Sequence, residues 1–165
     1  MTPESPRTNP LPDFDREMAI TRKVLERVPG EDPEWKPHPK SFSMAHLSQL
    51  VARMPGWLPP MLREPHIDLA GSAGYSVEAP SALLAEFDRN VEAAREALGE
   101  VTEAALAEQW SLRAGDKVLM TEVREDAVRS QLHHMVHHRA QLGVYLRLRD
   151  IPVPCMYGPT ADEAW

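Results

Sequence analysis

The decisive stretch of this sequence is residues 122–148, EVREDAVRSQLHHMVHHRAQLGVYLRL. Apolar residues recur along it in heptad-like steps, namely Val128, Leu132, Met135, Leu142 and Leu146. Because a helix brings residues at this spacing onto one face, the pattern predicts an amphipathic helix. We expect it to run from about Glu122 to Leu148 and to end before Asp150 and Pro152, which cannot continue it. At this length it should be the backbone of a helical bundle.

Three shorter amphipathic segments precede this helix. They predict helices over residues 14–28, from Ser43 to the Pro-Gly-Trp of residues 55–57, and from Ser81, as N-cap, to Gly99. The connections after the first and second helices are long, and no region is rich in strands. The sequence therefore predicts an all-α fold, a four-helix bundle with long crossover connections.

The segments between these helices carry less regular patterns. Residues 31–40 contain three prolines around Trp35, which favours an extended connection anchored by the indole. Residues 58–79 show no sustained period, and we expect them to form the longest irregular stretch. Residues 102–108 predict a short helical turn. Residues 110–120 are β-prone around Ala114-Gly115-Asp116, which is compatible with a small hairpin or with a simple loop.

Composition limits the class of protein. A chain of 165 residues suits a single domain, residues 1–165, with residues 1–12 as a flexible, proline-rich tail. The net charge of -7 gives no field that would attract nucleic acid. No apolar stretch approaches the ~20 residues needed to cross a membrane, and none resembles a secretion signal. The lone Cys155 cannot form an internal disulfide, which fits the cytoplasmic location that we expect. Its free thiol is either inert, as lone cysteines usually are, or a ligand or nucleophile.

Four of the seven histidines lie within residues 131–139, QLHHMVHHR. His134 and His138 are four residues apart, so a helix projects both imidazoles from one face, as in helical histidine pairs that share a zinc-type metal. They share their stripe with Gln131, Gln141 and Tyr145 and should face a partly polar pocket, whereas His133 and His137 are expected near the rim. The alternative is that these imidazoles only satisfy polar contacts between helices.

A metal site would need a further ligand from another segment, because catalytic zinc takes about three protein ligands. His46, on the predicted second helix, is the natural candidate, and His38 and His66, in loops, are poorer ones. The sequence shows neither a Ser/His/Asp signature nor a glycine-rich phosphate loop. Any chemistry would therefore have to come from the metal.

Several phrases of the sequence resemble the DinB/YfiT-like family, the metal-binding four-helix bundles of the damage-inducible group, which also resembles mycothiol- and bacillithiol-dependent transferases. The resemblance is carried by WKPHPKS at residues 35–41, MPGW at 54–57 and HHRAQLGVYLR at 137–147. PVP at residues 152–154 and YGP at 157–159 extend it. The match covers nearly the whole chain.

This resemblance implies one divalent metal, nickel or zinc, held by three histidines, one on the second helix and two on the fourth. His134 and His138 match the latter two, but the second-helix position, seven residues before Trp57, is Leu50. His46 lies one turn earlier, which displaces its imidazole by ~6 Å along the helix. A relocated site would combine His46 with His134 or His138, and with Gln131 or Gln141.

Two functions follow from these observations. The first is a divalent-metal-dependent transferase, thiol-dependent, or a hydrolase, which uses the helical histidine pair. The alternative is a metal-free small-molecule-binding or dimeric interaction module, with Leu50 filling the vacated space. The resemblance also implies a homodimer. Arg139 and Gln141, next to the pair, are candidates to orient a substrate or a ligand. The alternative, which applies above all to Arg139, is that the side chain bonds a neighbouring helix.

Overall fold

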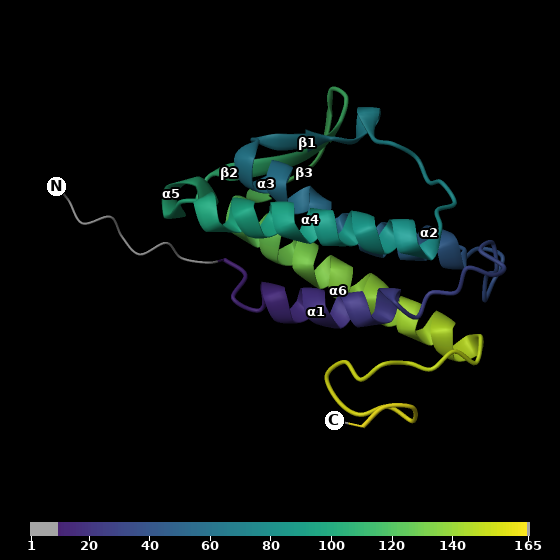
Figure 1. Cartoon of the computed structure of the whole chain (residues 1–165). Helices are drawn as coiled ribbons and strands as arrows, with labels where there is room; N and C mark the ends of the chain where they lie inside the picture. Colours follow the sequence, from purple (N-terminus) through teal and green to yellow (C-terminus); the bar gives the residue numbers. More distant parts are fainter. Residues whose placement is uncertain (1–9, 165) are drawn as a thin grey trace.

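The computed structural model describes residues 10–164, and these residues are mostly helical (Figure 1). The long helices α1 (Phe14–Leu25), α2 (Met44–Arg53), α4 (Pro80–Glu100) and α6 (Arg124–Leu148) pack side by side. The short elements are η1 (Met54–Trp57), α3 (Leu58–Arg63), η2 (Leu69–Gly71) and α5 (Glu103–Leu106). Strands β1 (His66–Asp68), β2 (Gln109–Ala114) and β3 (Lys117–Val123) form a small sheet.

The core lies between the long helices and is built from the apolar stripes that the sequence predicts. Along residues 14–28, the side chains at helical spacing on one face are all buried: Phe14, Met18, Thr21, Val24, Leu25 and Val28. The helix itself ends at Leu25 rather than at Val28, because tighter turn hydrogen bonds, such as Arg27 N to Val24 O, replace the helical pattern before Pro29. On α6, Val128, Leu132, Met135, Leu142 and Leu146 are all buried, as predicted.

Helices α2 and α6 run antiparallel, and two hydrogen bonds fix their register. Gln131 Nε2 donates to the Met54 carbonyl at 3.1 Å, and Tyr145 Oη donates to the Phe42 carbonyl at 3.1 Å. Between these two contacts, the middle of α2 lies opposite the middle of α6. Leu50 therefore comes at the level of the histidine pair.

The start of α2 is fixed by its cap and by the connection before it. The helix begins after Ser43, as predicted, and Ser43 Oγ accepts a hydrogen bond from His46 N, which satisfies one of the free amides of the first turn. Residues 31–40 contain no regular helix or strand. The ring of Trp35 meets that of Tyr145 edge-on at 5.6 Å, which confirms the indole as the anchor of this connection.

The prediction for residues 58–79 was wrong over its first two thirds. The chain forms α3, β1 and η2 there, and only residues 64–65 and 72–79 are without helix or strand. Pro59 and Pro60 are compatible with α3 because they occupy its first turn, where a missing amide proton costs nothing. Pro80 has the same place in α4, so Ala79, not Ser81, is at the N-cap.

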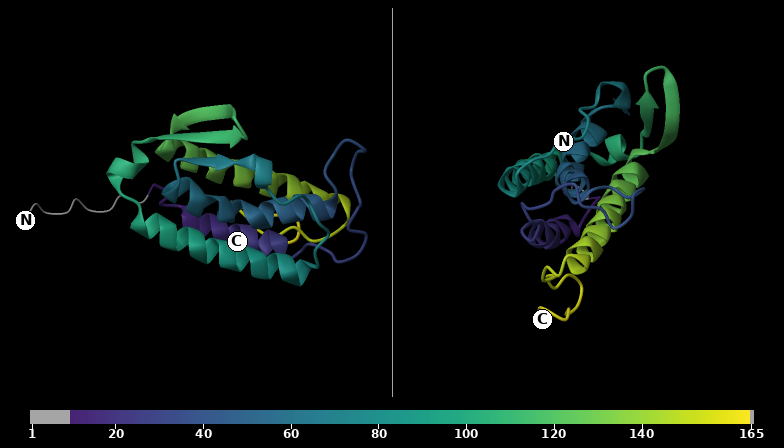
Figure 2. Two further views of the ribbon diagram at one scale, coloured as in Figure 1. Left: turned by 90° about the horizontal axis from the view of Figure 1, so that it is seen from above. Right: turned by 90° about the vertical axis from the view of Figure 1, so that its right-hand side faces the viewer.

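The β-prone residues 110–120 form a hairpin, which resolves the open alternative. Strands β2 and β3 are antiparallel, and Gly115, with φ of 60°, makes the turn between them. Strand β1 pairs with β2 in parallel, so the fold is not all-α. The sheet lies over α3 and the first half of α6 (Figures 1 and 2).

The two ends of the chain bear on two further predictions. The flexible tail predicted for residues 1–12 lies largely outside the described residues, and within them Pro10 and Leu11 are buried. Leu11 belongs to the core cluster. None of the helices within residues 10–164 is long and apolar enough to cross a membrane.

Candidate functional site

His134 and His138 lie one turn apart on α6 and contact each other directly. Their Nε2 atoms are 2.9 Å apart, which is a hydrogen-bond distance. His138 is buried, with 9% of its surface exposed, whereas His134 lies nearer the solvent. The predicted pairing of these two imidazoles is therefore present in the fold.

Gln141 determines which nitrogen of His138 carries a proton. The Nδ1 atom of His138 is 2.8 Å from Gln141 Oε1, and a carbonyl oxygen can only accept. Nδ1 must therefore be the donor, and neutral His138 presents the lone pair of Nε2 to its neighbour. His134 Nε2–H then donates to that lone pair, so the pair and Gln141 form a chain of hydrogen bonds.

This chain of hydrogen bonds cannot hold a proton on every nitrogen, because two N–H groups would then face each other at 2.9 Å. The pKa of His134 is lowered below its ordinary value of 6.5, first by burial and then by the charges of His138 and His137. The neutral form of His134 is therefore favoured near pH 7.

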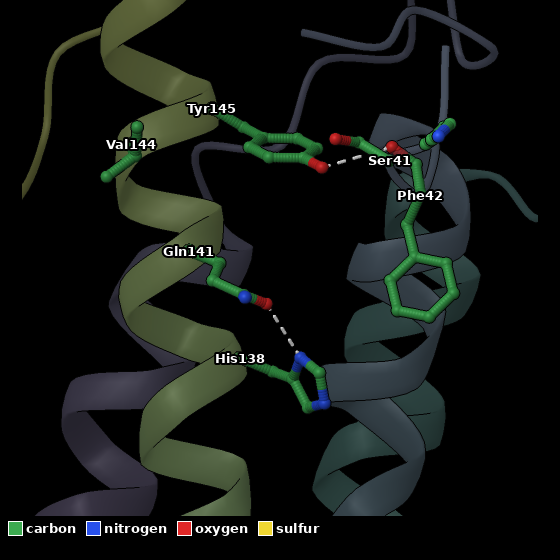
Figure 3. Close-up of a pocket in the computed structure, with 7 residues that line it drawn as sticks. Ser41, Phe42, His138, Gln141, Val144 and Tyr145 are labelled. Carbon is green, nitrogen blue, oxygen red and sulfur yellow. Dashed lines mark hydrogen bonds between the residues drawn. The ribbon is translucent and has the colours of Figure 1, made fainter. Parts of the chain in front are cut away.

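A cleft of about 380 Å³ opens beside His138, between α6 and the residues just before α2 (Figure 3). It is lined by Lys40, Ser41, Phe42, His138, Gln141, Val144 and Tyr145. The imidazole of His138 points from α6 toward the facing helix, and Phe42 lies across from it, with 6.3 Å between ring centres. This cleft combines one cation, one imidazole and an aromatic wall.

The other predicted ligand candidates lie apart from the pair. The ring of His46 is stacked on Tyr75 at 4.4 Å and meets Phe42 at 4.4 Å. His38 is exposed, and its Nδ1 accepts from the Lys40 amide, while His66 is exposed on β1. Within residues 10–164, no three His, Cys, Asp or Glu side chains come together as a group that could hold a metal ion.

Leu50 lies half-buried against the core and lines a hollow of about 400 Å³ that it shares with His46 and Trp57. A leucine offers no lone pair, so α2 contributes a packing surface at the level of the histidine pair.

The fit of this site to a metal follows from these positions. Two nitrogens that share a tetrahedral zinc at ~2.0–2.1 Å would be roughly 3.3–3.4 Å apart, so the observed contact is a hydrogen bond between imidazoles. The described residues do not supply the three-histidine set that the resemblance implies.

Arg139 points away from the cleft and bonds α1. Its guanidinium is 1% exposed and donates to Glu17 Oε2 at 2.8 Å and to Thr21 Oγ1 at 3.0 Å. The prediction that Arg139 bonds a neighbouring helix is confirmed, and Gln141 is the residue that orients the imidazole. Sequence reasoning did not find Phe42 as a site residue, although its position directly before the N-cap Ser43 is a usable signal.

Comparison with known proteins shows which solved structures share this fold. No family model matches the sequence, and no curated protein matches it. A DinB-like protein of Bacillus subtilis, YjoA, has a solved structure that superposes with a TM-score of 0.68 at 17% identity, over 87% of this chain and 93% of that one. A DinB-like protein of Bacillus cereus superposes with a TM-score of 0.66 at 19% identity, over 90% and 95%. The chain therefore has a DinB-like fold, which confirms the predicted resemblance at the level of structure.

Proposed function

We propose that this chain is a small-molecule-binding protein of DinB-like fold, which works without a three-histidine metal centre and binds its ligand in the cleft beside His138. The observation that carries the proposal is the hydrogen bond between the two Nε2 atoms. This hydrogen bond, at 2.9 Å, engages the two nitrogens that a metal would need. Leu50 stands on α2 at the position where the resemblance implies the third ligand.

The lining of the cleft indicates the chemistry of the ligand. Lys40 brings a positive charge to its rim, Gln141 offers an amide, and Phe42 and Val144 offer apolar surface. His138 engages its two ring nitrogens with Gln141 and His134, so it offers the cleft an aromatic surface rather than a free polar atom. A small organic acid with an apolar body suits this combination of groups.

A titration with phenylacetate, followed by NMR chemical shifts of the backbone amides, tests the proposal. We expect saturable shifts at Lys40, Phe42 and Gln141. Lys40→Gln should weaken binding about two- to fivefold, because an exposed charge contributes modestly. Lys117→Gln, which removes an exposed lysine on β3 outside the cleft, is the matched control. Absence of saturable shifts, or equal affinity in the two lysine variants, would reject the cleft as the binding site.

The second candidate is a divalent-metal-dependent transferase or hydrolase. The observation that favours it is the second contact of His138, since metal-bound histidines usually donate their other N–H to a polar partner such as Gln141. Zinc and nickel titration of untagged protein, purified without an immobilised-metal column, separates the two candidates. Saturable uptake near one ion per chain that is lost in His134→Ala would favour the metal-dependent function.

The proposal also includes the arrangement of the four long helices. We interpret α1, α2, α4 and α6 as a four-helix bundle with long crossover connections, within a single domain. The homodimer and the cytoplasmic location implied above stay predictions, and sedimentation velocity of the untagged chain would test the dimer.

A further inference from the structure

A second pair of histidines lies on the solvent side of α6. His133 and His137, here called the outer pair, are both exposed and stand four positions apart in the middle of the helix. Side chains at this spacing lie one above the other, with ~5–6 Å between their Cβ atoms. Two imidazoles on successive turns of one helix face are a spacing at which histidines share a transition metal ion.

The ring nitrogens of the outer pair are free, unlike those of the inner pair, His134 and His138. The inner imidazoles engage each other through Nε2, and His138 also engages Gln141. His133 makes no hydrogen bond or ring contact with any residue in the described part of the chain, and His137 makes only an edge-on contact with the ring of His138, with 5.1 Å between ring centres. Each outer imidazole can therefore present a lone pair to an ion without breaking an existing hydrogen bond.

The fold holds the two turns that carry the outer pair in place. Leu132 and Met135 are buried in the core beside them, and Arg139 bonds Glu17 on α1. Both turns also lie well inside a 25-residue helix, away from its ends, where helices fray. The two ligands are thus already positioned before an ion arrives, and such preorganisation favours binding.

The charges on α6 are compatible with a bound cation at this place. The helix contains no lysine. Arg129, one turn before His133, donates to Glu125 Oε1 at 2.7 Å and to Asp126 Oδ1 at 3.2 Å, so two carboxylates compensate its charge. The whole chain has a net charge of -7, which also favours the approach of cations.

The ligand type determines the class of metal. Imidazole nitrogen suits copper, nickel and zinc, whereas magnesium and calcium prefer oxygen ligands. We infer that His133 and His137 form a surface site for a divalent ion of this class, with copper bound more strongly than nickel or zinc, and with water at the remaining positions. The ion joins two turns of α6 and stabilises the folded chain. This site uses neither of the α6 histidines that the resemblance implies as ligands, and it does not depend on binding in the cleft beside His138.

Calorimetric titration of the untagged chain with nickel, up to about 1 mM, tests the inference. We expect saturable uptake of one ion per chain. His133→Asn leaves a single outer imidazole and should weaken nickel binding about tenfold or more. His134→Asn removes the neighbouring exposed imidazole, which belongs to the inner pair, and is the matched control that should keep the affinity. No saturable uptake by the native chain, or a larger loss in His134→Asn than in His133→Asn, would overturn the site.

A variant with an unchanged number of histidines tests whether the two imidazoles act together. His137→Asn combined with Ala140→His keeps two exposed imidazoles, but seven residues place them ~10 Å apart along the helix, too far to share one ion. Nickel affinity should therefore stay as low as in His137→Asn alone. Nickel should also raise the melting temperature of the native chain and of His134→Asn, but not that of His133→Asn. Binding by the combined variant as strong as by the native chain would overturn chelation by the outer pair.

Discussion

Two neighbouring residues of α6, His138 and Arg139, have opposite tasks because the helix turns them to different sides. His138 faces α2 and the cleft, while Arg139 enters the interface with α1. There Arg139 bonds Glu17, which also accepts a hydrogen bond from Tyr157. Burial opposes the charge of Glu17, but the hydrogen bonds from Tyr157 and Arg139 outweigh it and lower the pKa of this carboxyl. The pair is thus charged, buried and mutually dependent.

Arg139→Met should lower the free energy of unfolding by about 3–5 kcal/mol, because it leaves the Glu17 carboxylate buried without its cation. Guanidinium chloride denaturation measures the change. The double variant with Glu17→Met should recover much of the loss, since it removes the uncompensated charge. Arg129→Met, which removes an exposed pair with Glu125 on the same helix, should change stability little. A similar loss in both arginine variants would contradict the buried pair.

The histidine pair should make the stability of the fold depend on pH. The folded chain lowers the pKa of His134 below 6.5, chiefly by burial, so the unfolded chain binds more protons at mildly acidic pH. The contribution of His134 is therefore complete above about pH 6.5 and is lost as the pH falls toward its folded pKa. The melting temperature should fall between pH 7.5 and 5.5.

This pH dependence has a matched control on the same helix. His134→Asn should make the fall in melting temperature shallower, whereas His133→Asn, at an exposed position outside the pair, should leave it unchanged. Part of the slope should remain in His134→Asn, because burial also lowers the pKa of His46. An unaltered slope in His134→Asn would show that the imidazole contact does not govern titration.

At the scale of elements, the helices could be predicted from sequence because their signals are periodic and long. The buried faces of the four long helices and the start of α2 after Ser43 could be predicted from spacing and residue type alone. Helix α3 was missed because prolines in a first turn resemble those of a loop. Strand β1 was missed because three residues have no period, and their pairing with β2 comes from a segment more than forty positions away. The position of His46 depends on Tyr75 in an irregular segment, which local patterns do not place.

That irregular segment, residues 72–79, is held on α2 mainly by Gln49. The side chain of Gln49 is buried, donates to Ser76 Oγ at 3.0 Å and accepts from Ser76 N at 3.1 Å. Gln49→Leu should release the segment, and amide hydrogen exchange over residues 72–79 should rise about tenfold, as expected for the loss of roughly 1–2 kcal/mol of local hydrogen bonding. Ser76→Ala keeps the backbone bond and should have a smaller effect. Unchanged exchange in Gln49→Leu would assign the restraint to the His46–Tyr75 stack instead.

At the scale of the whole molecule, the DinB-like fold can form without the three-histidine metal site that the resemblance implies. The core that brings α2 opposite α6 is apolar and does not include the histidine pair, so this framework does not require the three-histidine set that the resemblance implies. This separation explains why the fold could be predicted from sequence whereas the function could not. The fold follows from the pattern of buried residues, but the proposed function depends on single side chains, such as the leucine at position 50, that the pattern does not explain.

A histidine at position 50 should create a metal site. Leu50→His adds a third imidazole at the level of His134 and His138, on a helix whose register is already fixed by Gln131 and Tyr145. We expect zinc affinity to rise on the order of tenfold or more over the native chain, measured by competition with a chelating dye, because a third ligand completes the protein share of a catalytic-type site. Leu84→His, at a half-buried position on α4, is the matched control and should not gain affinity. The gain should also vanish when His134→Ala is added. If Leu50→His binds no better than the control, then α2 and α6 hold their side chains too far apart for a shared ion. That outcome would strengthen the proposal that this chain binds its ligand without a metal.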